Sequence, residues 1–117
     1  MADDRAPERP PNEDRSDDGA DDGVAIELET TGSGRRYRLT VDGAEAGELD
    51  FTEADDVRTY LHTGVREAFG GRGLASALVR RALDDARRDG VRVVAVCSYV
   101  KGYLERHPEE QDLLAGR

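Results

Sequence analysis

A glycine-rich turn between a strand pattern and a helix pattern limits the possible folds most. Gly70, Gly71 and Gly73 surround Arg72 directly before an apolar-periodic run that begins at Leu74. Glycine costs about 0.5–1 kcal/mol relative to alanine inside regular structure, so this cluster indicates a backbone that a ligand approaches closely. A turn of this kind at a helix N-terminus presents free N–H groups and the positive end of the helix dipole, which together bind phosphate.

The residues after this turn predict one helix and then a buried strand. Residues 74–89 place leucine, valine and alanine at helical spacing, and Gly90 follows as a C-cap candidate. The segment 91–100 is almost continuously apolar and rich in valine, which is typical of an interior strand of a sheet and not of an edge strand. With the strand pattern at 56–65 before the turn, this order predicts a right-handed β-α-β unit.

The N-terminal half of the domain alternates apolar and polar residues, which predicts antiparallel strands. The segments 24–30 and 35–41 alternate clearly, and Asp42 and Gly43 mark a hairpin turn into a third strand. In the fourth strand, alternation places Leu61 and Val65 on one face and Tyr60 and His62 on the other. With a short C-terminal helix that ends before Pro108, the chain is predicted to have an α/β fold with a mixed sheet.

Charge and composition divide the 117 residues into an acidic tail and one domain. Residues 1–23 hold nine acids and three arginines with almost no apolar side chains, which predicts disorder. Residues 24–117 carry 17 acids against 14 bases, which argues against nucleic acid as a partner. Cys97 is the only cysteine, so we expect neither a disulfide nor a metal site, and we expect a cytoplasmic protein. No apolar stretch approaches the roughly 20 residues that span a membrane.

The stretch "VREAFGGRGLASALVRRALDDAR" resembles the central motif of the GNAT superfamily of N-acetyltransferases, which runs Arg/Gln-x-x-Gly-x-Gly/Ala. Gly73 and Ala75 match its two final small residues, whereas Gly70 stands where the family has Arg or Gln. The stretches "LHTGV" and "VCSYVKGYLERHPE" are similar to short, single-domain GNAT-like enzymes of the YjdJ type. In that group a cysteine ends the strand after the helix and Tyr-x-x-x-His-Pro follows. The resemblance runs from Val24 to Leu114 and implies the GNAT-like acyl-CoA N-acyltransferase fold.

By this resemblance the chain binds acetyl-CoA as co-substrate and acetylates an amine. Arg72 is a candidate to supply the positive charge that is missing at Gly70, and Arg66 is either a phosphate contact or a solvated charge at a strand end. The resemblance assigns cofactor binding to Val65, Arg66, Gly70, Gly71, Arg72, Gly73, Leu74 and Ala75. These small relatives lack the N-terminal helices that build the acceptor site of larger GNAT enzymes. The acceptor therefore stays open between a small molecule and a protein lysine or N-terminus.

Three residues are candidates for the chemistry, each with a structural alternative. Tyr103 matches the tyrosine that GNAT enzymes place beside the CoA sulfur as general acid, or it packs in the core. Cys97 is either a nucleophile that takes the acetyl group or a small buried apolar residue. His62 is either a base toward the amine or toward Cys97, or a structural histidine. Direct attack by the amine and an acetyl-Cys97 intermediate both remain open.

The sequence leaves three hypotheses for the function of the chain. The leading hypothesis is an acetyl-CoA-dependent N-acetyltransferase. The alternative is a non-catalytic module that has the same fold and binds CoA or another protein. Two departures favour it: Gly70 differs from the motif, and the acceptor helices are missing. Acyl transfer to a thiol or hydroxyl is the third.

Overall fold

The computed structural model describes residues 23–116 and contains one five-stranded sheet. The strands are β3 (Val24–Thr30), β4 (Arg35–Val41), β5 (Ala44–Ala54), β6 (Val57–Val65) and β7 (Arg92–Ala95), in that spatial order. The first four form an antiparallel meander, and β6 pairs with β7 in parallel. This arrangement confirms the predicted mixed sheet. The predicted disorder of the tail concerns residues that, apart from Gly23, lie outside the described part of the chain.

The hairpin between β4 and β5 forms at the predicted turn. Asp42 and Gly43 both have positive φ values, 51° and 86°, as a two-residue turn that matches the strand twist requires. On the inner face, Tyr37 and Leu39 of β4 are fully buried beside Leu49 and Phe51 of β5. The alternation read from the sequence therefore corresponds to one buried and one exposed sheet face.

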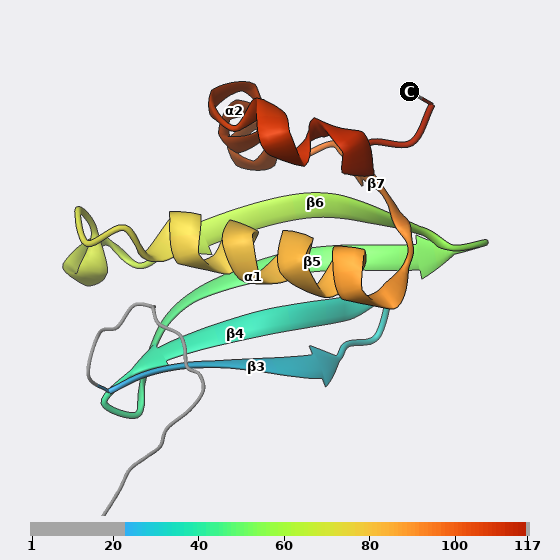
Figure 1. Cartoon of the computed structure of the whole chain (residues 1–117). Coiled ribbons are helices and arrows are strands. Elements are labelled where there is room, and N and C mark those ends of the chain that lie inside the picture. Colours follow the sequence, from blue (N-terminus) through green and yellow to red (C-terminus); the bar gives the residue numbers. More distant parts are fainter. Residues whose placement is uncertain (1–22, 117) are drawn as a thin grey trace, which may run out of the picture.

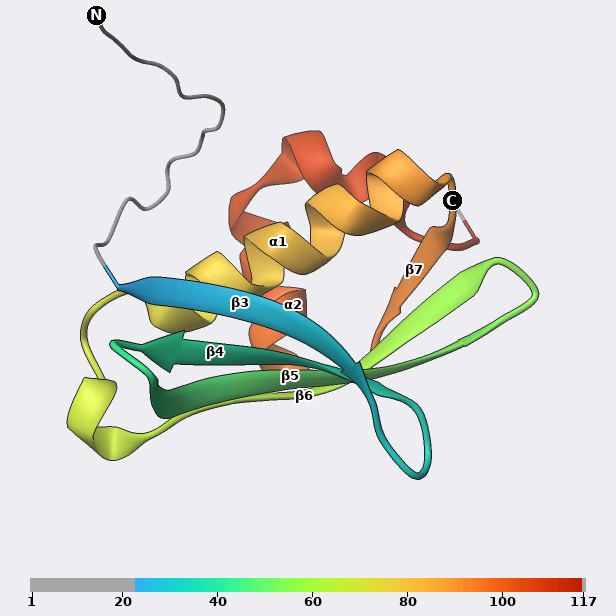
Figure 2. The same cartoon turned by 90° about the horizontal axis from the view of Figure 1, so that it is seen from below.

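Two helices lie on one side of the sheet and close the core (Figures 1 and 2). The long helix is α1 (Leu74–Asp89) and the shorter one is α2 (Ser98–Arg106), with 3-10 turns η1 (Glu67–Phe69) and η2 (Pro108–Leu113). The apolar stripe of α1 is buried, and Gly90 ends the helix with a φ of 73°, as predicted for a C-cap. No described helix covers the opposite face of the sheet (Figure 2).

Two buried tyrosines fasten α1 to the sheet. The hydroxyl of Tyr37 donates to Asp85 Oδ2 at 2.7 Å, and the hydroxyl of Tyr60 donates to the carbonyl of Ala82 at 2.8 Å. Burial raises the pKa of both tyrosines above the ordinary value, and for Tyr37 the neighbouring Asp85 carboxylate adds to the effect. These bonds fix the position of the helix whose N-terminus carries the glycine turn.

The predicted facing of β6 is wrong after Tyr60, because the strand contains a β-bulge. Phe51 pairs with Tyr60 and Asp50 pairs with His62, so Leu61 is an extra residue. Leu61 is 43% exposed, whereas Tyr60 is fully buried. The bulge changes the phase of alternation, so that Tyr60 and His62 lie on opposite faces of the sheet.

The prediction that 91–100 forms an interior strand is also wrong. Only residues 92–95 are a strand, β7 lies at the end of the sheet order, and α2 begins at Ser98. Val93 is fully buried against the helices, but Val94 and Val96 are 37% and 53% exposed. The run of valines misled the prediction because no described helix covers the outer face of this strand.

Candidate functional site

The glycine turn has a left-handed backbone at two of its residues. Gly71 and Gly73 have φ values of 77° and 74°, in the left-handed region where side chains cause strain. A Cβ atom added to either residue would meet no atom within 4 Å, so open space surrounds both. Gly70 is extended, with a φ of −66°, so its backbone conformation does not require glycine. Two of the three glycines thus form a turn that other residues would adopt only with strain, and no atoms lie close to their Cα positions on the side where a side chain would project.

The N-terminus of α1 has no capping side chain. Gly73 occupies the N-cap position, no side chain accepts a hydrogen bond from the first turn, and the N-cap carbonyl of Gly73 accepts from Ala77. Leu74 is buried and Ala75 is half-buried, so the N–H groups here adjoin both the core and the exposed turn. The Arg72 guanidinium lies over the Phe69 ring at 5.8 Å from its centroid, next to this turn. An uncapped helix N-terminus with a nearby arginine suits an anionic group.

Beside this turn, β6 and β7 separate. Their parallel pairing covers only Val57–Tyr60 and Arg92–Ala95, and the Tyr60 carbonyl accepts from both Val96 and Cys97 at 3.0 Å. After Tyr60, β6 continues to Val65 while pairing only with β5. The edge of residues 61–65 that faces away from β5 therefore has no strand partner within the described residues.

Cys97 and the start of α2 lie across from this free edge. The Cys97 thiol, 7% exposed, lies 3.4 Å from the Thr63 hydroxyl, which links the two sides of the opening. The hydroxyls of Ser76 in α1 and Tyr99 in α2 are 3.3 Å apart. The first turns of both helices therefore meet at the opening between β6 and β7.

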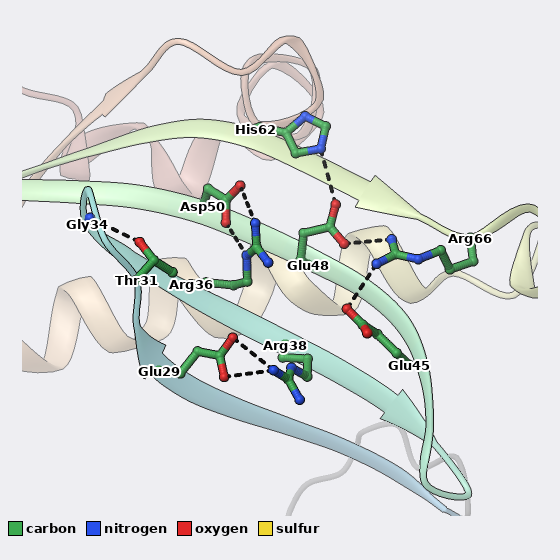
Figure 3. A network of polar contacts seen from close by, with 10 residues as sticks. All are labelled: Glu29, Thr31, Gly34, Arg36, Arg38, Glu45, Glu48, Asp50, His62 and Arg66. Carbon is green, nitrogen blue, oxygen red and sulfur yellow. Dashed lines mark hydrogen bonds and ion pairs between the residues drawn. The ribbon is translucent and has the colours of Figure 1, made fainter.

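A chain of polar contacts lies on the other face of the sheet, in front of the strands in Figure 3. Glu48, whose side chain is 12% exposed, contacts His62 Nε2 at 3.2 Å and accepts from Arg66 at 2.6 Å. Arg66 also contacts Glu45 at 3.0 Å. The hydrogen bond to Glu48 and its negative charge raise the pKa of the Arg66 guanidinium. A carboxylate only accepts hydrogen bonds, so the contact with Glu48 favours a proton on Nε2 of His62.

The predicted site residues thus fall into separate groups. The glycine turn and Cys97 lie around the opening, but Arg66 is engaged by two carboxylates on the outer face and His62 lies there with it. The partner of Cys97 is Thr63, whose side chain faces the side opposite that of His62. His62 is therefore not placed as a base for Cys97.

Tyr103 lies in the core of the domain. It is 4% exposed on the buried side of α2, and its ring stacks on that of His107 with centroids 4.1 Å apart. The structural alternative for Tyr103 therefore has a packing partner. Val65 ends β6 and packs partly buried against the core, close to the turn that follows.

Sequence reasoning missed Glu48, Thr63 and Tyr99. Glu48 alternates with Asp50 on the polar face of β5, which is a weak signal, because most charges at such positions are solvated. Thr63 lies inside the quoted stretch "LHTGV", next to His62, and only the phase change at the bulge turns it toward Cys97. No local pattern indicates which hydroxyl Tyr99 meets.

Comparison with known proteins identifies the family. A family model described as GCN5-related N-acetyl-transferase matches residues 36–113. The chain belongs to this family. The chain is 27% identical to Protein NATD1 of Gallus gallus over 93 residues, which is 78% of this chain and 84% of that protein. It is 26% identical to Protein NATD1 of Xenopus tropicalis over 91 residues, 76% of this chain and 84% of that protein.

Solved structures share the fold of this chain. A GCN5-like protein of Staphylococcus aureus matches with a TM-score of 0.58 and 24% identity, covering 78% of this chain and 89% of that one. A ribosomal-protein-alanine N-acetyltransferase of Brucella melitensis matches with a TM-score of 0.59 and 15% identity, covering 81% and 93%. These likenesses confirm the predicted GNAT fold.

Residues 23–116 contain neither a membrane-spanning helix nor a cluster of metal-binding side chains. None of their helices combines the length and apolar character that crossing a membrane demands. No group of three or more His, Cys, Asp or Glu side chains among them is arranged to hold a metal ion.

Proposed function

We propose that this chain transfers the acetyl group of acetyl-CoA to a primary amine. The observation that carries the proposal is the opening between β6 and β7, directly beside the uncapped N-terminus of α1. The N–H groups of 71–75 and the helix dipole suit a pyrophosphate. The unpaired edge of 61–65 suits an extended chain that contains amides, such as the pantetheine arm of CoA, because such chains add to free strand edges.

The chemistry requires one proton to leave the amine and one to reach the sulfur. The amine nitrogen attacks the thioester carbonyl, the carbon–sulfur bond breaks, and an amide and a CoA thiolate result. An alkylammonium has an ordinary pKa near 10.4, so a base assists at neutral pH. In this proposal Nδ1 of His62 takes that proton. Glu48 is a positioning residue that holds the imidazole, and Arg66 holds Glu48.

The thiolate takes its proton from Tyr103 if the amine attacks directly. The covalent route through Cys97 remains the second mechanism, in which the thiolate of Cys97 first accepts the acetyl group. A module that binds CoA without transfer is the alternative function. The burial of Tyr103 and its stacking on His107 favour that alternative, because they give the tyrosine a structural role.

Binding and turnover are measured separately. Acetyl-CoA and CoA should raise the melting temperature, whereas ATP and ADP should not, since a ligand at a hundred times its Kd stabilises the native state by about 2.7 kcal/mol. Release of free thiol from acetyl-CoA in the presence of an amine, with the amide identified by mass spectrometry, reports transfer. Stabilisation without amine-dependent release supports the binding module, and no stabilisation contradicts both.

Replacing Glu48 tests how His62 is held. Glu48→Gln should lower kcat/KM for the amine roughly tenfold, because a charge-assisted hydrogen bond to a half-exposed imidazole is lost, and should leave KM for acetyl-CoA unchanged. The nitrogen-15 spectrum of His62 should show the Nε2–H tautomer in the wild type and a mixture of the Nε2–H and Nδ1–H tautomers in the variant. Glu29→Gln is the matched control, because Glu29 pairs with Arg38 on the same face without contacting His62. An unchanged spectrum in Glu48→Gln contradicts the positioning role.

A further inference from the structure

Exposed apolar side chains gather where β6 and β7 separate. The described residues contain five large apolar side chains that are exposed: Leu28, Leu61, Val94, Val96 and Tyr99. Three of these lie close together in the sheet: Leu61 in the middle of β6, Val94 in β7 and Val96 directly after β7. Val94 of β7 pairs with Thr59 of β6. Leu61 lies two residues after Thr59, and Val96 lies two residues after Val94. We call Leu61, Val94 and Val96 the apolar patch.

The apolar patch lies on the face of the sheet that no described helix covers. Leu61 and His62 together oppose Asp50 in the bulge, and both line a hollow of about 210 Å³. The other walls of this hollow come from Arg36 and Asp50 and from the loop between β3 and β4. Figures 2 and 3 place α1 on the other side of the sheet. A second substrate can therefore reach the opening from this face without meeting the helices.

The surroundings of the apolar patch favour a positively charged ligand with an apolar part. Glu45, Glu48 and Asp50 supply three carboxylates on this face of β5, against the two guanidinium groups of Arg36 and Arg66. Three carboxylates and two guanidinium groups, counted without His62, give a net charge of −1. This net negative charge favours the binding of an ammonium group. It disfavours a ligand that also carries a carboxylate. The hollow is smaller than the roughly 300–1,000 Å³ of sites for drug-sized ligands, so it suits a small molecule.

We infer that the acetyl acceptor is a small primary amine on an apolar stem, which reaches the opening from the face that no described helix covers. The inference rests on the proposed function, since it names the acceptor of that same reaction. The stem lies on the apolar patch, and the amine nitrogen lies beside His62. The nitrogen gives one proton to His62 as it forms the amide bond, and the departing CoA sulfur takes one proton up. An amino acid is a poor acceptor, because its carboxylate meets the acidic residues of β5.

A matched set of amines tests this inference at saturating acetyl-CoA. Phenethylamine has the stem and no carboxylate, phenylalanine adds the carboxylate, and ethylamine lacks the stem. Phenethylamine should exceed each of the others in kcat/KM by roughly tenfold, which is the size of selectivity that a small apolar contact provides. Equal rates for phenethylamine and ethylamine, or a preference for phenylalanine or for lysine in peptides, would overturn the inference.

Two variants locate the selectivity on the apolar patch. Leu61→Ser and Val96→Ser should each lower the ratio of kcat/KM for phenethylamine to kcat/KM for ethylamine about threefold to tenfold. Leu28→Ser is the matched control, because Leu28 is 39% exposed on β3, at the other edge of the sheet. Equal losses in the control would overturn the assignment.

Two further measurements separate the other outcomes. A wild-type dimer that Leu61→Ser converts to a monomer would make the apolar patch a contact between copies, and would overturn the inference. If acetyl-CoA stabilises the protein and amines are acetylated without selectivity, only the inference fails. If acetyl-CoA neither stabilises the protein nor loses its acetyl group, the proposed function fails as well.

Discussion

Replacing Tyr37 by phenylalanine removes one hydrogen bond that fastens α1 to the sheet. Tyr37 is fully buried, its hydroxyl lies 2.7 Å from Asp85 Oδ2, and the Asp85 side chain is 5% exposed. A hydrogen bond to a charged group contributes about 1.5–3 kcal/mol. Asp85 keeps Arg81 and Arg88 at 3.1 and 2.9 Å, so the carboxylate stays paired. We therefore expect Tyr37→Phe to lower the free energy of unfolding by about 2 kcal/mol at pH 8.

The loss of unfolding free energy in Tyr37→Phe should depend on pH. Burial, with the charge of Asp85, raises the pKa of Tyr37, so the folded protein keeps a proton that the unfolded chain releases near pH 10. Stability from this group is complete below pH 10 and falls by about 1.4 kcal/mol up to pH 11. Because phenylalanine has no such proton, the difference between wild type and variant should shrink to about 0.6 kcal/mol at pH 11. Tyr60 also has a raised pKa, but it is present in both proteins and cancels.

Urea unfolding of both proteins at pH 8 and pH 11, followed by circular dichroism, measures these differences. A difference below 0.5 kcal/mol at pH 8 would show that the Tyr37–Asp85 bond stabilises little. A difference that is the same at both pH values would refute the reasoning on protonation. The thermal midpoint gives a second readout, since 1 kcal/mol shifts the melting temperature of a domain of this size by roughly 4–8 °C.

Three further predictions concern the candidate site. Gly73→Val should abolish CoA binding, whereas Gly90→Val, which imposes a side chain at a nearly equal φ at the other end of α1, should cost similar stability and leave binding intact; equal affinities in a titration would show that the turn has been misread. If the amine attacks directly, Cys97→Ala should reduce turnover little; an acetyl adduct on Cys97, seen by intact mass and discharged by amine, would establish the covalent route instead. Tyr103→Phe should slow turnover and spare CoA binding, and unchanged turnover would leave Tyr103 with only its packing role.

The features that the sequence predicted correctly depend on neighbours along the chain. The helix over 74–89, its end at Gly90 and the hairpin at Asp42 and Gly43 all follow from local periodicity and turn chemistry. Local rules were sufficient for these elements.

The polar chain on the outer face could not be predicted in the same way. Glu48 and Arg66 are 18 residues apart and meet only because β5 and β6 pair in one particular register. The position of β7 at the sheet edge likewise depends on what covers its outer face, which its valines do not encode. Features that depend on strand register, or on which faces of the sheet are covered, can be found only from the three-dimensional structure.

The extra residue at Leu61 accounts for both the main error in the sequence prediction and the arrangement of the candidate site. With uninterrupted alternation after buried Tyr60, His62 would point toward the helices and Thr63 toward the outer face. The bulge reverses both, so that His62 reaches Glu48 on the outer face and Thr63 reaches Cys97 on the other. The same residue lies where the pairing of β6 with β7 ends, because the Tyr60 carbonyl is the last acceptor on that edge. One inserted residue therefore opens the strand edge and sets the candidate base and the cysteine on opposite sides of it, which is the arrangement that two substrates arriving from opposite faces require.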